Sequence, residues 1–177
     1  MEELTQVARS LSPYVVIALE GDPIKTHYAS VWAAPSPMPN VWVKKFTTED
    51  KDDIIANMWD IPIGRDKSVI MIPNSRVDHY IIFYDLTYRS MTLKGTVRDL
   101  EVFIQEIKGK GPTVNVIIHG RSTDKEEEDA IKVCRRNNIS FQRSPETDLI
   151  KTICYRVYGQ RAALIDKQIK SILDASK

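Results

Sequence analysis

The sequence predicts an α/β fold with three layers, in which helices cover both faces of a mostly parallel sheet. Apolar runs alternate along the chain with helical patterns, as they do in successive βα units. Residues 68–72 and 113–118 are rich in Val and Ile, which is typical of strands buried on both faces. The first apolar run leads through a Gly-Asp-Pro turn into a helix that carries Lys25-Thr26, which is the order of elements in a P-loop.

The turn after the first strand lacks the glycines of a working P-loop. In the pattern G-x-x-x-x-G-K-[ST], the last two positions fall on Lys25 and Thr26, and the two glycines fall on Leu19 and Ile24. Glycines at those positions let backbone N–H groups wrap around phosphate oxygens without a Cβ in the way. We therefore expect a P-loop-like α/β domain with a degenerate nucleotide site.

The other elements follow from apolar spacing and from residues that start or stop helices. We expect strands at residues 14–19, 41–46, 68–72, 79–86, 113–118 and 139–142. We expect helices at residues 24–34, 96–108, 124–137 and 144–158, and a last helix at 161–175 after a break at Gly159. We expect a further helix that begins at Thr48 and includes the apolar residues Ile54, Ile55, Met58 and Trp59. These elements divide into the α/β domain, residues 1–143, and a small helical lid segment, residues 144–177.

Composition places the chain among ordinary globular proteins. Its 177 residues suit one domain, and 42% of them are apolar. The formal net charge of +1 gives no general case for nucleic-acid binding. Cys134 and Cys154 lack the spacing of a metal site, so we expect two reduced thiols. The three histidines are scattered, and we expect neither a metal nor another cofactor.

The sequence gives no sign of membrane insertion or secretion. No apolar run approaches the roughly 20 residues that a membrane-spanning helix needs. The N-terminus is polar and amphipathic, which is not the pattern of a signal peptide. We therefore expect a cytoplasmic protein without a membrane partner.

Lys25, Thr26 and Asp85 form one candidate site. A P-loop NTPase uses a Lys for the phosphates, a hydroxyl for Mg²⁺ and a strand-ending Asp for the same ion. One interpretation is a divergent nucleotidase that uses these three residues. The other is that Lys25-Thr26 is a chance dipeptide on an exposed helix and that Asp85 closes a strand. The two missing glycines favour the second interpretation, in which the chain has no catalytic residue.

A modest basic cluster is a second candidate. Arg135 and Arg136 end the helix predicted at residues 124–137, and Arg143 follows shortly after. The cluster indicates either a solvated surface or a nucleic-acid-binding or nuclease module with a Rossmann-like sheet.

An apolar turn is the third candidate. Trp59, Ile61, Pro62 and Ile63 crowd apolar side chains around a proline, just before a predicted strand. These side chains either belong to the core or, if exposed, form an apolar knob that fits a pocket of a partner protein.

Four stretches of the chain resemble a known family. Residues 14–30 contain an apolar strand and a Gly-Asp-Pro turn, and residues 40–74 run from a strand to an apolar turn and a further strand ending in Asn74. Residues 113–141 and 144–158 continue with strand, helix, strand and a Pro-started helix. In this order they are similar to the N-terminal part of the delta subunit of the bacterial DNA polymerase III clamp loader, an AAA+-like protein that lacks ATP binding and opens the ring-shaped sliding clamp.

The resemblance implies a non-catalytic function in DNA replication. It implies an AAA+-like fold, contact with a sliding clamp and other clamp-loader subunits, and DNA contact that is at most indirect. The clamp-inserting turn of the family corresponds by position to residues 61–64, where the usual aromatic or leucine pair is absent. The C-terminal collar domain of the family has no counterpart, so we expect either an N-terminal fragment of a longer protein or a compact relative with a different function.

Overall fold

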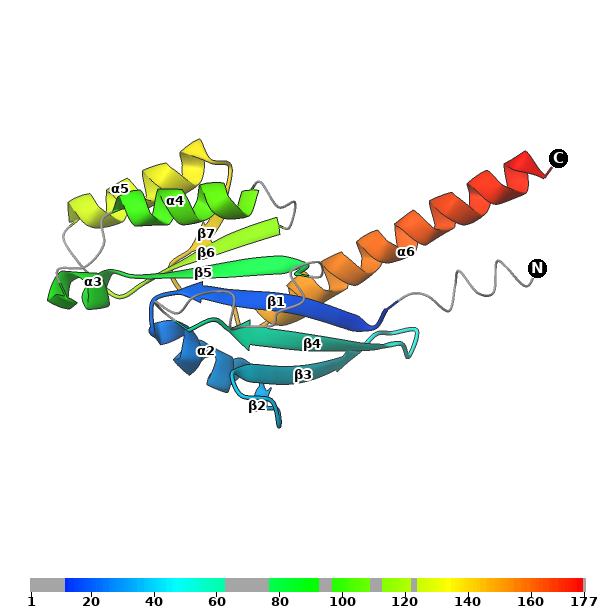
Figure 1. Ribbon diagram of the computed structural model, residues 1–177, viewed down its shortest axis with the longest axis horizontal. Coiled ribbons are helices and arrows are strands. Elements are labelled where there is room, and N and C mark those ends of the chain that lie inside the picture. Colours follow the sequence, from blue (N-terminus) through cyan, green and yellow to red (C-terminus); the bar gives the residue numbers. More distant parts are fainter. Residues whose placement is uncertain (1–11, 63–76, 93–96, 109–112, 122–123, 177) are drawn as a thin grey trace.

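The computed structural model describes residues 12–62, 77–92, 97–108, 113–121 and 124–176, which form an α/β structure (Figure 1). The strands in these ranges are β1 (Tyr14–Gly21), β2 (Ala34–Pro35), β3 (Val41–Thr47), β4 (Asp53–Asp60), β5 (His79–Asp85), β6 (Thr113–His119) and β7 (Ser140–Gln142). The helices are α2 (Ile24–Trp32), α3 (Leu86–Thr92), α4 (Val97–Lys108), α5 (Asp124–Arg136) and α6 (Leu149–Ala175).

The strands described here form one seven-stranded sheet in the order β2-β3-β4-β1-β5-β6-β7. Strands β4, β1, β5, β6 and β7 are parallel, and β3 is antiparallel to both of its neighbours. The predicted α/β class with a mostly parallel sheet is therefore confirmed. The strand predicted at residues 68–72 lies outside the described residues.

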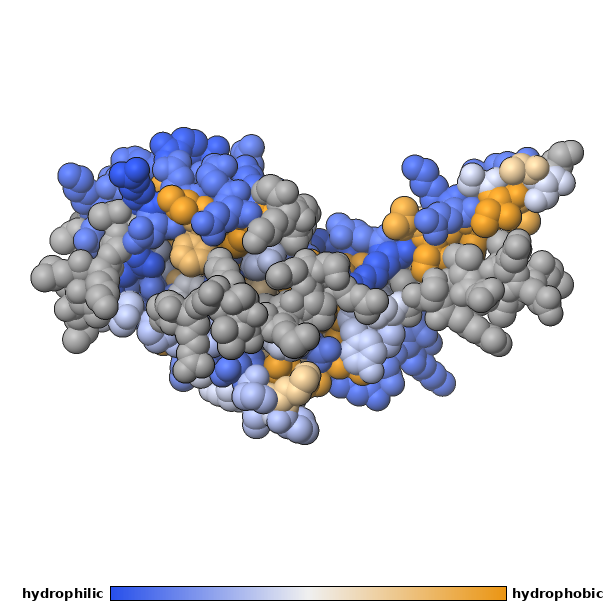
Figure 2. All heavy atoms as spheres, viewed as in Figure 1, coloured by the Kyte–Doolittle hydropathy of each residue, from blue (hydrophilic) through white to orange (hydrophobic). Residues whose placement is uncertain are grey.

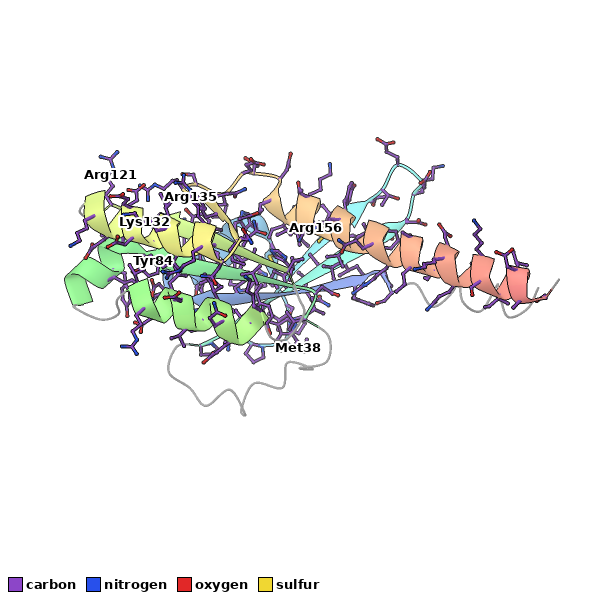
Figure 3. All side chains as sticks on the ribbon, turned by 90° about the horizontal axis from the view of Figure 1, so that it is seen from above. Met38, Tyr84, Arg121, Lys132, Arg135 and Arg156 are labelled. Carbon is purple, nitrogen blue, oxygen red and sulfur yellow. The ribbon has the colours of Figure 1, made fainter. Side chains whose placement is uncertain are left out.

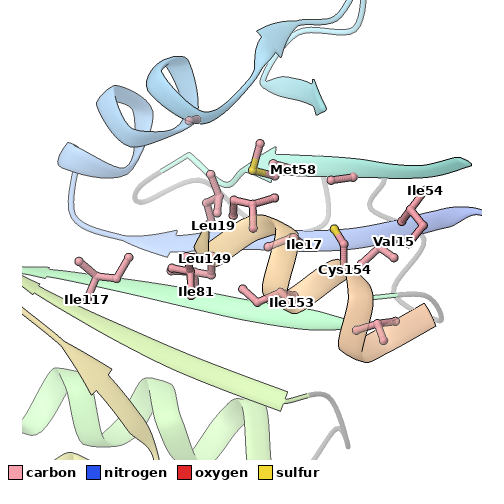
Figure 4. Close-up of a cluster of buried hydrophobic side chains, with 14 of the residues drawn as sticks. Val15, Ile17, Leu19, Ile54, Met58, Ile81, Ile117, Leu149, Ile153 and Cys154 are labelled. Carbon is pink, nitrogen blue, oxygen red and sulfur yellow. The ribbon is translucent and has the colours of Figure 1, made fainter. Parts of the chain in front are cut away.

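Two cores sandwich the sheet because successive side chains of a buried strand point to opposite faces. In β5, Ile81 and Phe83 enter the core beneath α2 and α6, whereas Ile82 and Tyr84 enter the core beneath α4 and α5. Figure 4 shows the first of these cores, where α6 places Cys154 among the apolar side chains of β1 and β4. This arrangement gives the three layers expected from the sequence.

The centre of the sheet contains a topological switch point. Strand β1 leads into α2 on one face, and its neighbour β5 leads towards α4 on the other face. In open parallel sheets, ligands bind in the crevice that such a change of direction leaves at the carboxyl ends of the strands. We therefore expect a functional site at the carboxyl ends of β1 and β5.

The helix predicted from Thr48 onwards is wrong, because residues 53–60 form strand β4. The alternation of buried Ile54, Ala56 and Met58 with less buried neighbours has the period of a strand. Thr48, expected to start a helix, instead starts the turn of a β3–β4 hairpin, where its N–H donates to the Asp52 carbonyl over 2.8 Å. The apolar spacing of this segment fits both periods, and pairing with β1 and β3 decides between them.

The break predicted at Gly159 is also wrong. Helix α6 runs from Leu149 to Ala175 without interruption, and tertiary packing of its first half outweighs the roughly 1 kcal/mol that a glycine costs within a helix. That half buries Leu149, Ile153 and Val157 in the same core as β1. The first half of the predicted lid segment therefore packs in the same core as the α/β domain. The second half projects beyond the sheet (Figure 1).

Both cysteines are free and buried. Burial raises the pKa of the Cys134 thiol to about 11 and that of the Cys154 thiol to about 12. Thiols with such pKa values remain protonated and unreactive near neutral pH. Across the described ranges, no helix is long and apolar enough to cross a membrane.

His79 is buried at the start of β5, at the opposite edge of the sheet from the switch-point crevice. Its Nδ1 lies 2.6 Å from Thr113 Oγ1 and 3.0 Å from Nη2 of Arg156, which Figure 3 shows on α6. Burial and the Arg156 charge lower the pKa of His79 to about 3. The imidazole is therefore neutral in the folded protein over the whole range in which an exposed histidine titrates.

We predict that His79 makes the protein less stable as the pH falls below 6.5. His79 takes up a proton near pH 6.5 in the unfolded chain and only near pH 3 in the folded protein. Its contribution to the free energy of unfolding is therefore fully present above pH 6.5 and is lost as the pH falls towards 3. Between pH 7 and pH 5 the free energy of unfolding should fall by roughly 2 kcal/mol more in the wild type than in His79→Gln. Urea unfolding at the two pH values measures this difference, and equal losses in both proteins would contradict the assignment.

Candidate functional site

Four charged side chains are buried together around the carboxyl ends of β1, β4 and β5. Asp22 follows β1, Asp60 ends β4, Asp85 ends β5, and Lys25 lies in the first turn of α2. Each of the four is at most 9% exposed. Burying a charge is costly unless it is paired and hydrogen-bonded, so the partners of these groups define what the site can do.

Asp60 holds both Lys25 and Thr26. The Thr26 hydroxyl donates to Asp60 Oδ2 over 2.5 Å, and Lys25 Nζ lies 3.4 Å from Asp60 Oδ1. Lys25 also donates to the carbonyl of Gly21 over 3.4 Å. P-loop NTPases use a Lys for the phosphates, and a Ser or Thr with a strand Asp for Mg²⁺. The structure brings these three residue types together, with each bonded to another member of the set.

Asp60 is the functional candidate that the sequence prediction missed. The helix predicted across residues 54–59 hid the fact that Asp60 ends a strand paired with β1. The sequence of this segment carries no deciding signal, because its apolar spacing fits a helix as well as a strand.

Asp85, the metal-ion candidate of the nucleotidase interpretation, ends β5 and bonds to the backbone that follows it. Its Oδ1 accepts hydrogen bonds from the N–H groups of Thr87, over 3.0 Å, and Tyr88, over 3.2 Å. These bonds satisfy two of the unpaired N–H groups at the start of α3. The carboxylate of Asp85 therefore caps a helix.

Asp22 spans the crevice between β1 and β5. Arg89 donates two hydrogen bonds to the Asp22 carboxylate, from Nε to Oδ2 over 2.8 Å and from Nη2 to Oδ1 over 3.0 Å. The N–H of Asp85 adds a third bond to Oδ2 over 2.7 Å. The crevice is thus filled by a carboxylate of the chain itself, in the bidentate geometry that makes such pairs strong.

The link between β1 and α2 consists of Asp22 and Pro23, and its N–H groups are used internally. The N–H of Asp22 donates to the carbonyl of Phe83 on β5 over 2.9 Å, and those of Lys25 and Thr26 donate to carbonyls of the same turn. Pro23 has no N–H. Gly21 has a φ of +94°, and a Cβ there would overlap the carbonyl of Phe83. This glycine therefore allows β1 to approach β5 closely, and the turn is not a cradle of N–H groups for an anion.

Tyr28 and His119 close the crevice on the side of α2. The Tyr28 hydroxyl lies 2.9 Å from His119 Nδ1, and its ring stacks on Phe83. Burial and the nearby Asp85 carboxylate raise the pKa of Tyr28, so its hydroxyl stays protonated. This contact ties α2 to the end of β6.

The predicted partner-binding turn is only partly described. Ile61 is 5% exposed and its N–H donates to the carbonyl of Leu19 over 3.0 Å, so it packs in the fold. Trp59 and Pro62 are half-buried. Ile63 lies outside the described residues. Docking through this turn requires an exposed Ile61 side chain, but Ile61 is buried in this structure.

The arginines of the predicted nucleic-acid cluster contact neighbouring side chains. Arg136 Nη2 lies 2.6 Å from Glu101 Oε1, and Arg143 Nε lies 3.0 Å from Glu127 Oε1. Arg135, seen on α5 in Figure 3, lies over the ring of Phe141. The cluster thus connects α5 with α4 and with β7, and a role in nucleic-acid binding stays a prediction.

Within the part of the chain that the structure describes, no three or more His, Cys, Asp or Glu side chains converge on a position that could hold a metal ion. No family model and no curated protein matches this chain.

We predict that removing one partner of the Lys25–Asp60 pair destabilises the protein more than removing both. Asp60→Ala leaves the Lys25 ammonium buried without its counter-charge, which should lower the free energy of unfolding by about 3 kcal/mol or more. Lys25→Met/Asp60→Ala removes both charges and should lose less than Asp60→Ala alone. Urea unfolding of the wild type, both single variants and the double variant measures the coupling. If the losses of the single variants simply add, the two charges do not compensate each other.

Proposed function

We propose that this chain is a nucleotide-independent, protein-binding domain on a P-loop-type scaffold. The observation that carries the proposal is that Asp60 binds both Lys25 and Thr26. In a P-loop NTPase these side chains bind phosphate and Mg²⁺. Here they already compensate one another inside the protein, so a nucleotide would have to break buried charge-assisted bonds before it gained any.

The crevice contacts support the same conclusion. The carboxylate of Asp22 fills the position where a parallel sheet offers room to a ligand, and Arg89 holds it there. An anionic ligand would have to displace this carboxylate and would meet its charge. The chain then functions by binding other proteins through its surface.

The resemblance to the clamp-loader delta subunit gives the proposal a specific form. The proposed partners are a sliding clamp and other clamp-loader subunits, and the AAA+ relationship rests on the sequence resemblance alone. Because Ile61 is buried, we look to other apolar side chains for the contact. The projecting half of α6 exposes Leu164, Ile172 and Leu173, at 58%, 39% and 47%, and apolar atoms line this segment in Figure 2. Exposed apolar side chains of this kind are typical anchors of protein interfaces.

A second candidate is a divergent nucleotide-binding protein. Lys25, Thr26 and Asp60 are the residue types that hold Mg²⁺ and phosphate, at the ends of adjacent elements. In this function Asp60 replaces Asp85 as the metal ligand. Nucleotide binding would require the Lys25–Asp60 pair to open and the short turn to rearrange.

A nucleotide titration separates the two candidates. We expect the wild type to bind neither fluorescent ATP nor fluorescent GTP in the presence of Mg²⁺, at nucleotide concentrations up to the millimolar range, because the binding groups are bonded within the protein. Lys25→Ala is the control, with its fold checked by circular dichroism. Saturable binding that Lys25→Ala loses would favour the nucleotide-binding function and contradict our proposal.

A pull-down against the sliding clamp of the same organism tests the partner. We expect the wild type to bind the clamp, and Leu164→Ser/Leu173→Ser to bind at least tenfold more weakly because an apolar anchor is lost. Asp166→Ser/Lys167→Ser changes two exposed polar residues of the same helix and should bind like the wild type. Absence of wild-type binding would rule out the clamp as partner, and an equal effect of both variants would show that the apolar side chains are not the anchors.

A further inference from the structure

We propose that Asp22 is an internal ligand of an anion-binding site formed by Arg89 and the backbone N–H of Asp85. A small oxyanion, of the carboxylate or monoanionic phosphate class, should bind there once the Asp22 side chain is removed. The inference rests on the proposed function, because it explains what keeps phosphate out of the crevice of the wild type. Asp22 is then an autoinhibitory residue: its carboxylate occupies the anion site that Arg89 and the N–H of Asp85 form.

The donors and the carboxylate come from opposite sides of the crevice. Asp22 follows β1, whereas Asp85 ends β5 and Arg89 lies on α3. Three donated bonds of 2.7, 2.8 and 3.0 Å converge on the two oxygens of Asp22. A planar guanidinium fork with an N–H beside it is the arrangement that recognises carboxylate and phosphate oxygens in proteins.

Other contacts hold the donors in place when the Asp22 side chain is absent. The guanidinium of Arg89 lies 4.3 Å from the centroid of the Tyr84 ring, and its Nη1 lies 3.5 Å from Asp99 Oδ2. The Asp85 N–H belongs to a strand paired in register with β6. The main-chain bond from Asp22 to Phe83 does not need the carboxylate, so the turn itself should survive the change.

Burial and charge limit the size and the charge of the ligand. Asp22 is 5% exposed and the side chain of Arg89 is 14% exposed, so loss of the carboxylate leaves room for a group of about its own size. Asp85 and Asp99 lie close by, and their charges oppose a ligand with two negative charges. Formate therefore matches both the size and the charge of the lost group, whereas dihydrogen phosphate matches its charge but is larger.

The test compares four full-length proteins by thermal unfolding in formate or phosphate, with chloride used to keep the ionic strength constant. They are the wild type, Asp22→Ala, Asp22→Asn and Asp22→Ala/Arg89→Leu. In Asp22→Ala we expect a saturable rise in Tm of about 4 °C at ten times Kd. Asp22→Asn keeps the crevice filled with an uncharged side chain of the same shape, and the double variant lacks the guanidinium, so both should respond no more than the wild type.

The outcomes separate this inference from the proposed function. A flat response of Asp22→Ala, or a response that persists without Arg89, contradicts the inference even if the wild type binds no nucleotide. A response to formate alone assigns the site to carboxylates, and a response to both anions assigns it to oxyanions in general. If Asp22→Ala does not fold in chloride, its refolding yield in formate and in phosphate becomes the measurement. Recovery in either anion supports the site, and failure in all three salts contradicts it.

Discussion

The structure depends on the mutual compensation of charges that the fold buries at the carboxyl edge of its sheet. Asp22, Lys25, Asp60 and Arg89 have little access to water. Their burial is tolerable only because Asp60 faces Lys25 and Asp22 faces Arg89. The same pairs fasten α2 to β4, and the turn after β1 to α3. The pairing that makes this burial tolerable thus also occupies Lys25 and Arg89, the two cations that could bind an anion there.

The short turn after β1 does not form a phosphate cradle in the described structure. A cradle needs several consecutive N–H groups that point at the ligand. Here the N–H of Asp22 binds β5, Pro23 has none, and the N–H groups of Lys25 and Thr26 close the turn. The positive charge of Lys25 and the hydroxyl of Thr26 remain, but they point to Asp60. The turn thus offers few backbone donors to an anion, and the side chains beside it are paired within the protein, as the proposed nucleotide-independent function requires.

The sequence predicts the elements whose pattern admits one interpretation. Two such patterns are the amphipathic spacing of α4 and α5 and the β-branched runs of β5 and β6. The structure confirms these four elements. The spacing of residues 54–59 fits a helix as well as a strand, and the wrong choice concealed Asp60. The contact between Asp22 and Arg89 joins residues 67 positions apart, so no local pattern reports it. The candidate site was therefore only half predictable: Lys25 and Thr26 were found, and their partner was not.

Side chains of the chain itself occupy the crevice at the carboxyl ends of β1 and β5, and the backbone N–H chemical shifts of this region respond to any ligand that displaces them. We predict that millimolar ATP or GTP with Mg²⁺ leaves the ¹H–¹⁵N signals of Asp22, Lys25, Thr26 and Asp85 in place, because their contacts do not open. Saturable shifts of these signals, with smaller ones elsewhere, would show that a nucleotide enters the crevice and opens the internal pairs.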